Sequence, residues 1–313
     1  MVLKKSTPLV SIITSSLNQG EFIESAITSV DNQSYANIEH IIIDGGSTDN
    51  TLTILQNHSS NFSWLSEPDK GQSNAINKGI EKSSGELISW LNADDTLDPE
   101  AVSTIVANFN ALPEVDFLYG NCDYIDAQGE FIRSYPTQDF DLTTLIQETH
   151  VFIPQPATFI RKTALEKVGR LNEDFDYVMD LDLWIRLGLS GNGQHIHEKL
   201  ANLRLHQSAK SLNKLAAFAP ELVRLYEDLF SQDDLPYEIK QVEKTGTQNI
   251  YLRAADISLW SKEYNKARSY TIKAVSIKPI TAITTKVKSL AFPLMGKIGY
   301  WIKSLIMENP YEI

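Results

Sequence analysis

Short apolar runs alternate with helical patterns over the first half of the chain. The strand-like runs lie at Leu9–Thr14, Ile38–Ile43, Phe62–Leu65 and Glu86–Leu91. The stretches between them carry apolar residues at helical spacing, over 22–30, 51–58 and 75–81. Parallel strands need a long crossover, usually a helix, so this alternation is typical of βαβ units. The pattern therefore predicts an α/β fold with a doubly wound, mostly parallel sheet.

The same pattern continues less regularly as far as residue 211. Further strands are expected at 116–119, 131–135 and 158–160. Helices are expected at 143–150, 163–168 and 180–189. Past residue 211 strand signals are few, and the helical patterns lie at 221–230, 250–261 and 264–277. We therefore expect an α/β domain over 1–211 and a helical region over 212–313.

Composition narrows the class of protein. The 313 residues are 42% hydrophobic and 22% charged, which is enough for a large core and excludes disorder. The single cysteine, Cys122, excludes a disulfide framework or a cysteine-based zinc site within the chain. A net charge of −12 argues against general nucleic-acid binding. With no signal peptide or long apolar span evident, the expected location is cytoplasmic.

The last part of the chain is a basic amphipathic segment, residues 281–306. Residues 271–313 hold six Lys and two Glu, a balance of +4 in an acidic chain. Apolar residues recur there at helical spacing, and Pro293 interrupts the run. Such a helix suits the surface of an anionic membrane on the inner face of the cell envelope. It equally suits packing against the acidic body of the protein, and both interpretations stay open.

Polar residues gather where the apolar runs end. Ile13 is followed by a polar stretch from Thr14 to Asn18, Ile43 by Asp44, and Leu91 by the segment 92–95. Ligands of an open parallel sheet bind at the carboxyl ends of its strands. Each of these segments taken alone could be an ordinary turn or helix cap. Together they predict a concave acidic site.

A phosphate group at this edge would have to be bound without a glycine-rich loop. A Gly-x-Gly-x-x-Gly sequence and a phosphate-binding Gly-Lys-Ser/Thr loop are both absent. A divalent cation held by one or two carboxylates can neutralise a diphosphate instead, with phosphate oxygens and water completing its shell. Asp94, between Asn92 and Asp95 and beyond a buried strand, fits that requirement.

Seven segments, in order along the chain, resemble the family 2 glycosyltransferases of the GT-A fold. They are residues 10–20, 43–49, 67–79, 91–95, 155–159, 179–186 and 204–206. The resemblance extends over residues 8–211 and specifies the fold and reaction class, not the sugar. It implies a GT-A glycosyltransferase domain at 1–211 and a nucleotide-sugar donor, with UDP the expected nucleotide.

The resemblance also implies roles for single residues on the donor side. Asp44 would accept a hydrogen bond from the donor's base. The other residues implied on the donor side are Ser15, Leu17, Lys70, Asn74, Asn77, Asn92, Asp94 and Asp95. Asp94 would bind Mn²⁺ or Mg²⁺ at the diphosphate, and His206 would be a further metal ligand. Asn92 stands where many members have an acid, which puts more of the metal affinity on Asp94, together with His206. Asn74 stands where many members have Asp, which weakens the implied donor-side role at that position.

Asp180 matches the family's catalytic base. It would take a proton from an acceptor hydroxyl that attacks the anomeric carbon, with inversion. Asp180 could instead act only as a helix N-cap, and His206 as a buried loop histidine. Asp182 and Trp184 are expected to be structural. His195 and His197 have no expected role.

The predicted function is an inverting, metal-dependent glycosyltransferase acting on a glycan or lipid-linked glycan. The first alternative is a non-catalytic scaffold that binds nucleotide-sugar or glycan in a polysaccharide assembly complex. The second is a nucleotidyltransferase that makes the sugar nucleotide. The set Asp44, Asp94 and Asp180 argues against the scaffold. The absence of a basic, Gly-rich triphosphate loop argues against the nucleotidyltransferase.

Overall fold

The structure of the chain is a computed structural model that describes residues 7–59, 61–149, 151–207, 214–277 and 292–306. It divides into two compact units. The first comprises Met1–Phe140 and Val151–Leu205, and the second comprises Asp141–His150 and His206–Ile313. The expected boundary after residue 211 is therefore moved to residue 205. Residues 141–150, expected in the α/β domain, belong with the second unit.

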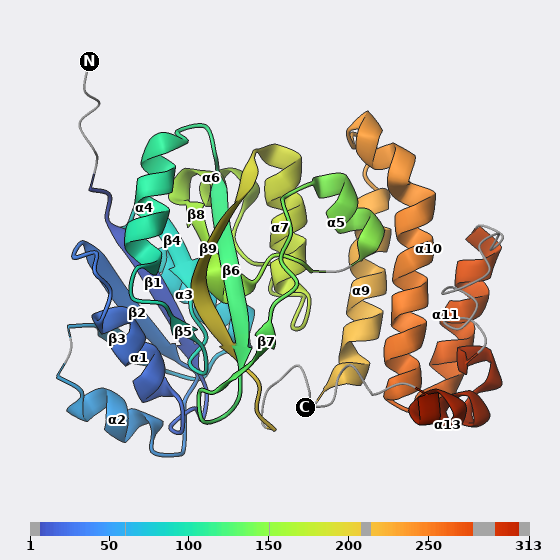
Figure 1. Cartoon of the computed structure of the whole chain (residues 1–313), viewed down its shortest axis with the longest axis horizontal. Coiled ribbons are helices and arrows are strands. Elements are labelled where there is room, and N and C mark those ends of the chain that lie inside the picture. The colour runs from blue at the N-terminus through green and yellow to red at the C-terminus, as the bar shows by residue number, and fades with distance from the viewer. Residues whose placement is uncertain (1–6, 60, 150, 208–213, 278–291, 307–313) are drawn as a thin grey trace. The chain divides into compact units, whose positions relative to one another are not determined.

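The first unit is built on a nine-stranded mixed sheet (Figure 1). Its order is β3-β2-β1-β4-β8-β6-β9-β5, with β7 beside β6. The strands are β1 Val10–Ser16, β2 Ile38–Asp44, β3 Ser63–Ser66, β4 Leu87–Trp90, β5 Thr96–Leu97, β6 Phe117–Ile125, β7 Phe131–Ser134, β8 Thr158–Arg161 and β9 Gly193–Arg204. The first four in this order are parallel, as the βαβ pattern predicts.

The sheet departs from a doubly wound parallel sheet beyond β4. Strand β8 is antiparallel to both of its neighbours, β4 and β6, and β9 is parallel to β6. The sequence patterns also gave no sign of β9, β5 or the helix α4 (Ala101–Ala111). Strand β9 mixes charged, polar and apolar residues, with a burial pattern that does not alternate, so a period of two cannot reveal it.

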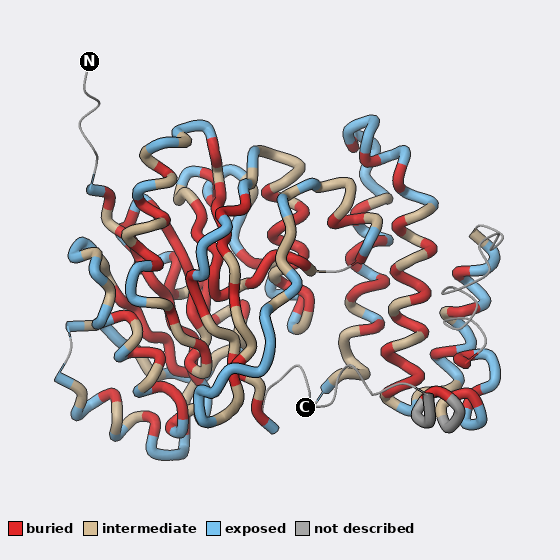
Figure 2. The backbone as a smooth tube through the Cα atoms, viewed as in Figure 1, coloured by how far each residue is buried: buried red, intermediate tan, exposed pale blue. Residues whose placement is uncertain are grey.

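Helices cover both faces of the parallel strands. These helices are α1 Ile23–Asp31, α2 Thr51–Asn57, α3 Gln72–Lys82 and α4. On β2, Ile42 packs with α1 and α2, while Ile41 and Ile43 pack with Ala75 of α3. Gly79 lets α3 approach β1, because a Cβ there would lie 2.3 Å from Ile13 Cγ2. Figure 2 shows the resulting band of buried residues along the strands.

His40 gives the core of the first unit a measurable pH dependence. It is 5% exposed on β2, and its Nε2 lies 2.9 Å from Thr14 Oγ1. Burial, and then the charge of His58, lower the pKa of His40 to about 3. The native state thus keeps His40 neutral, whereas the unfolded chain binds a proton near the ordinary pKa of about 6.5. This contribution to stability is present above about pH 6.5 and lost as the pH falls towards 3.

We therefore expect the free energy of unfolding to fall by about 2 kcal/mol more between pH 7 and pH 5 in the wild type than in His40→Gln. Urea titrations at the two pH values measure the difference. Equal pH dependence in both proteins would show that His40 is not held neutral in the native state.

The second unit is helical, as expected. Its helices are α5 Leu142–Glu148, α9 Leu215–Phe230, α10 Tyr237–Trp260, α11 Tyr264–Ile277 and α13 Lys297–Ile306. The hydroxyl of Tyr226 in α9 donates to the Ile146 carbonyl at 2.9 Å, which fastens α5 to this unit. The amide of Gln248 donates to the Ala274 carbonyl at 3.0 Å across the hairpin of α10 and α11. Long-range contacts of this kind explain why residues 141–150 leave the α/β unit.

The described part of the basic tail packs on the second unit. Lys303 pairs with Asp256 and lies 4.8 Å from the centre of the Trp260 ring. Tyr300 packs edge-on against Trp260, with ring centres 5.9 Å apart. Ile298 stays 61% exposed. Residues 281–291 of the predicted amphipathic segment lie outside the described residues, and contact with a membrane stays a prediction. Across the described ranges, the structure contains no helix long and apolar enough to cross a membrane.

Candidate active site

The carboxyl ends of the four parallel strands lie at one edge of the sheet. Ser16 pairs with Asp44, which pairs in turn with Ser66, so β1, β2 and β3 end in register. The Leu91 amide donates to the Ile13 carbonyl at 2.8 Å, which brings the end of β4 to the same edge. The polar residues that follow β1, β2 and β4 are thus brought together, as the sequence predicts.

Asp44 organises the turn that follows β2. It is fully buried, and its Oδ2 accepts from the Gly46 and Ser47 amides at 3.0 and 2.9 Å. Oδ2 also accepts from Ser66 Oγ at 2.6 Å, and Oδ1 accepts from Ser47 Oγ. Gly46 has φ +88°, a left-handed conformation that favours glycine. These donors occupy most of the carboxylate's acceptor capacity, so contact between Asp44 and a base remains a prediction.

The loop after β1 is tied to the loop after β2. The amides of Asn18, Gln19 and Gly20 donate to Ser47 Oγ, Thr51 Oγ1 and Asp49 Oδ2 at 2.7 to 3.0 Å. Burial raises the pKa of Asp49, but the hydrogen bonds from Thr51 and Gly20 outweigh it and lower that pKa overall. Asp49 is therefore held as an acceptor, and both loops form one polar rim.

Asn92 is the centre of a hydrogen-bond network after β4. Its Oδ1 accepts from Gln72 Nε2 at 2.8 Å. Its Nδ2 donates to Gln155 Oε1 at 2.8 Å and to Asp95 Oδ2 at 3.2 Å. Gln155 in turn donates to the Trp90 carbonyl at 2.5 Å. Asn92 is thus committed to the protein and shapes the loop that carries Asp94.

Asp95 is a buried carboxyl that binds the backbone of β9, and its contact with a donor stays a prediction. It is 2% exposed, and its Oδ1 accepts from the Arg204 amide at 2.9 Å. Burial and the neighbouring Asp94 raise the pKa of Asp95 well above its usual range. Asp95 joins the loop after β4 to the end of β9, whereas half-buried Asp94 is the acid of the pair that fits a cation.

Arg204 is a functional-site residue that sequence reasoning missed. Its guanidinium donates to the carbonyls of Asp94, Asp126 and Ala127 at 2.8 to 3.2 Å, and lies 5.3 Å from the Phe22 ring centre. Arg204 belongs to segment 204–206, one of the seven that resemble the family, but only the tertiary structure shows what it binds. It fixes the backbone of the Asp94 loop.

We expect Arg204→Met to lower the free energy of unfolding by about 3 kcal/mol, because it removes a buried guanidinium that donates to the half-buried carbonyls of Asp94 and Ala127. Denaturant unfolding measures this loss. The matched control is Arg170→Met, since Arg170 pairs with Glu81 at 3.5 Å on the surface and such pairs contribute less than about 1 kcal/mol. Similar losses in both variants would refute the anchoring role.

Asn77 and Asn74 lie on α3 and bind protein. Asn77 is 8% exposed, and its amide donates to Leu171 O at 2.9 Å and Glu173 Oε1 at 3.0 Å. Its Oδ1 accepts from the Leu171 amide at 3.0 Å. Asn74 donates to Glu173 Oε2 at 3.0 Å. This amide fixes the segment that leads to α7 (Met179–Ser190), with Glu173 as an unforeseen partner, and the donor contact of Asn77 stays a prediction.

Asp180 lies in the first turn of α7. Its Oδ1 accepts from the Leu181 amide at 2.8 Å, and the N-cap residue of the helix is Val178, not Asp180. Trp184, one turn further on, stacks on Trp90 with ring centres 5.5 Å apart. Trp90 is the last residue of β4, so this stacking places α7 against the strand that leads to Asp94.

The neighbours of Asp180 have the structural roles that the sequence predicts. Asp182 is 7% exposed and accepts from Arg186 Nε and Nη2 at 2.9 and 2.6 Å. Trp184 is fully buried. Both side chains therefore belong to the support of α7, and Asp180 is the acid of this turn that is half-buried.

The remaining predicted residues lie around this edge or in the other unit. Ser15 is buried near the end of β1, and Leu17 follows it with 52% of its surface exposed. Lys70 is exposed just before α3. His206 is 5% exposed and is the first residue of its segment in the second unit. Its role as a metal ligand stays a prediction.

The donor set at the strand ends fits a divalent cation held by few protein ligands. Asp94 is the half-buried carboxylate of the loop after β4, and a carboxylate oxygen is a ligand that a hard cation prefers. Mg²⁺ and Mn²⁺ sites of this type take one or two carboxylates and draw their other ligands from phosphates and water. The chemistry of these residues therefore matches the expected Mn²⁺ or Mg²⁺.

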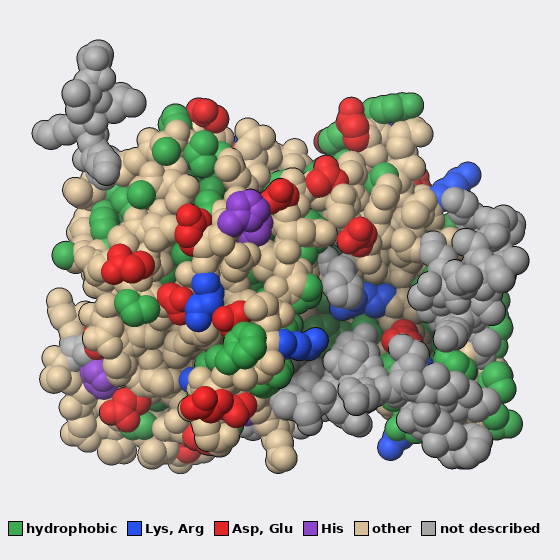
Figure 3. Space-filling view, viewed as in Figure 1, with side chains coloured by type: hydrophobic (Ala, Val, Ile, Leu, Met, Phe, Trp, Pro, Cys, Tyr) green, Lys and Arg blue, Asp and Glu red, His purple; other side chains and the backbone are tan. Residues whose placement is uncertain are grey.

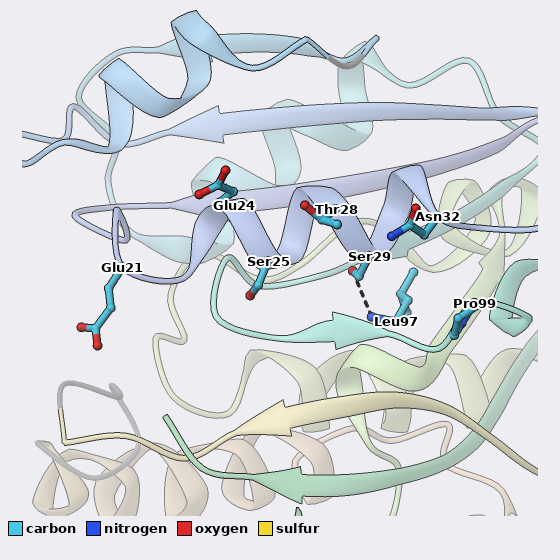
Figure 4. A pocket seen from close by; sticks show the side chains of 8 residues that line it. All are labelled: Glu21, Glu24, Ser25, Thr28, Ser29, Asn32, Leu97 and Pro99. Carbon is cyan, nitrogen blue, oxygen red and sulfur yellow. Dashed lines mark hydrogen bonds between the residues drawn. The ribbon is translucent and has the colours of Figure 1, made fainter. Parts of the chain in front are cut away.

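A cavity of 590 Å³ lies elsewhere, between α1 and the segment around β5 (Figure 4). It is lined by Glu21, Glu24, Ser25, Thr28, Ser29, Asn32, Leu97 and Pro99. Within it, Ser29 Oγ accepts from the Leu97 amide at 3.1 Å. None of the predicted site residues lines it, so it is not the candidate active site.

Comparisons with known proteins identify the class. Residues 11–169 match Glycosyl transferase family 2, and the chain belongs to that family. A glycosyltransferase of Rickettsia prowazekii is 29% identical over 275 residues, covering 85% of this chain and 84% of that protein. The chondroitin synthase of Escherichia coli is 30% identical over 217 residues, covering 67% of this chain and 31% of the synthase.

Solved structures show the same fold. S. aureus TarS 1–349, in complex with UDP-GlcNAc, matches with a TM-score of 0.68 at 13% identity, over 93% of this chain and 88% of that one. A mannosyltransferase from Pyrobaculum calidifontis, in complex with GDP-Man and Mn²⁺, matches with a TM-score of 0.59 at 14% identity, over 95% and 87%. The protein is a glycosyltransferase of GT-A fold that uses a nucleotide-sugar donor.

Proposed function

We propose that the protein is an inverting, metal-dependent glycosyltransferase of polysaccharide assembly. It moves a sugar from a nucleoside-diphosphate donor, by preference a UDP-sugar, to a hydroxyl of a glycan or lipid-linked glycan. A relative from Myxococcus xanthus, 30% identical over 213 residues (65% of this chain, 16% of that protein), is named an O-antigen biosynthesis protein. That name and the chondroitin synthase support a polysaccharide acceptor.

The main support for the proposal is that hydrogen bonds from the start of α3 reach two places. One is the loop that carries Asp94, and the other is the segment that carries Asp180. Gln72 donates to Asn92 in the loop of Asp94. The next residue, Ser73, lies 3.0 Å from the Phe175 carbonyl and 2.8 Å from Met179 Sδ, which adjoins Asp180. Two successive residues thus position the cation-binding loop and the segment of the base.

Each acid then has a distinct part in transfer. Asp180 takes the proton of the acceptor hydroxyl as its oxygen forms a bond to the anomeric carbon. The bond from that carbon to the diphosphate breaks on the opposite side, which inverts the configuration. Asp94 holds the divalent cation, which when bound stabilises the charge that develops on the leaving diphosphate.

A ligand panel tests the donor half of the proposal. Thermal unfolding is followed with UDP, GDP and their sugars, with and without Mn²⁺. A ligand at a hundredfold excess over its Kd stabilises the native state by about 2.7 kcal/mol. We expect UDP to stabilise the native state in the presence of Mn²⁺. A sugar-transfer assay with the stabilising donor is then the next step. Absence of stabilisation by every nucleotide would contradict the donor site.

A further inference from the structure

A cluster of two histidines and a carboxylate lies apart from the strand-end residues. Asp139 Oδ1 is 3.1 Å from His195 Nδ1 and 3.6 Å from His197 Nε2. One ligand atom from each residue lies within 4.8 Å of the others. Figure 3 shows histidine surface among acidic side chains on the first unit. The proposed transfer reaction uses none of these three residues.

The cluster is held in place from both sides. Tyr119 of β6 stacks on His195, with ring centres 5.2 Å apart and planes at 15°. Its hydroxyl donates at 2.7 Å to the carbonyl of Gln138, the residue before Asp139. The register of β6 and β9 shifts here, because Tyr119 pairs with His195 but Asn121 pairs with Lys199. Such bulges bend a strand and redirect its side chains.

Hydrogen bonding to Asn121 fixes which nitrogen of His195 carries the proton. Asn121 Nδ2 donates to the His197 carbonyl at 2.7 Å, so its Oδ1 faces His195 Nε2 at 2.9 Å. An amide oxygen can only accept, hence Nε2 carries the proton. In the neutral ring, Nδ1 then presents a lone pair to Asp139 Oδ1, which is also an acceptor. A cation between the two atoms resolves this conflict.

His195 is 8% exposed, and its Nε2 is occupied by Asn121, so Nδ1 is the ring atom directed at Asp139. The neutral ring is the form that coordinates a metal.

We propose that Asp139, His195 and His197 bind a divalent transition-metal ion of the Zn²⁺ type. Two imidazoles and a carboxylate are ligands that Zn²⁺ favours, with bonds of about 2.0–2.1 Å. Ligand atoms around a tetrahedral ion with such bonds lie about 3.3 Å apart. The two distances from Asp139 Oδ1 to the histidine nitrogens, 3.1 and 3.6 Å, bracket this value, and one nitrogen of each ring lies within 4.8 Å of the other. Asn121 is a positioning residue that orients His195 through Nε2.

The ion would fasten the segment after β7 to β9. Asp139 and His197 are 80% and 76% exposed, so the fourth position is open to water. This site is separate from Asp94, whose oxygen-rich surroundings suit Mg²⁺ or Mn²⁺.

Calorimetric titration of Zn²⁺ into untagged, metal-stripped protein tests the site. We expect one equivalent to bind and to raise the Tm. His197→Ala and Asp139→Asn, at exposed positions that should not impair folding, are each expected to weaken binding at least tenfold. Asn121→Ala should weaken it by about tenfold to a hundredfold. His58→Ala and Asp94→Asn, the controls, should bind as the wild type does.

Two results would overturn the site. One is the absence of Zn²⁺ binding to the wild type. The other is equal affinity in the wild type and in His197→Ala, which would place the bound ion elsewhere on the protein.

Discussion

Asp180→Asn is expected to lower kcat for sugar transfer by about 10²–10⁴-fold, the usual contribution of a general base. The substitution keeps the shape of the side chain and an Oδ1 that can accept from the Leu181 amide, so α7 should remain intact. What it removes is the basicity needed to take the acceptor's proton. Donor binding, measured by stabilisation with UDP and Mn²⁺, should stay within about twofold of the wild type.

Asp182→Asn is the matched control, two residues further along the same helix. Its carboxylate pairs with Arg186 at 2.6 Å, so this variant should lose stability while keeping kcat. The opposite order, with kcat lost in Asp182→Asn and kept in Asp180→Asn, would exclude Asp180 as the base. A loss of donor binding in Asp180→Asn would instead assign that acid to the donor side.

Asp94→Asn is expected to reduce kcat/KM by about 10²–10³-fold, because a divalent cation supplies several kcal/mol of stabilisation to a developing phosphate charge. The amide preserves the volume and removes the charge that holds the cation. The variant should therefore need a higher Mn²⁺ concentration for half-maximal activity, and UDP should no longer stabilise it in a metal-dependent way. Steady-state kinetics over a range of Mn²⁺ concentrations measures both effects.

Asp98→Asn controls for a general loss of negative charge near this loop. Asp98 accepts from Asn202 at 3.2 Å and pairs with Lys199 at 3.3 Å, away from the predicted metal ligand. Its Mn²⁺ dependence should match that of the wild type. An unchanged Mn²⁺ dependence in Asp94→Asn would refute the assignment of the cation to Asp94.

The sequence by itself determined the parallel half of the sheet and the edge at which the site lies. Buried strands carry short apolar runs, such as Ile41–Ile43 in β2, and the helices between them need amphipathic spacing, so both leave a local pattern. The chain direction then places Asp44 and Asp94 at the carboxyl edge. The motifs also indicated the family, and the family match over residues 11–169 confirms it.

Only the tertiary structure decided which polar side chains form hydrogen bonds to distant parts of the protein. Asn77 binds a backbone group 94 residues away, and Arg204 reaches the Asp94 carbonyl 110 residues away. Such hydrogen bonds depend on which loops meet in space, and local periodicity carries no record of that. For the same reason, the sequence did not predict β9, the place of residues 141–150 in the helical unit, or the contact of Asp139 with His195. A sequence pattern specifies the elements and their buried faces, whereas the partners of a polar group are specified by packing.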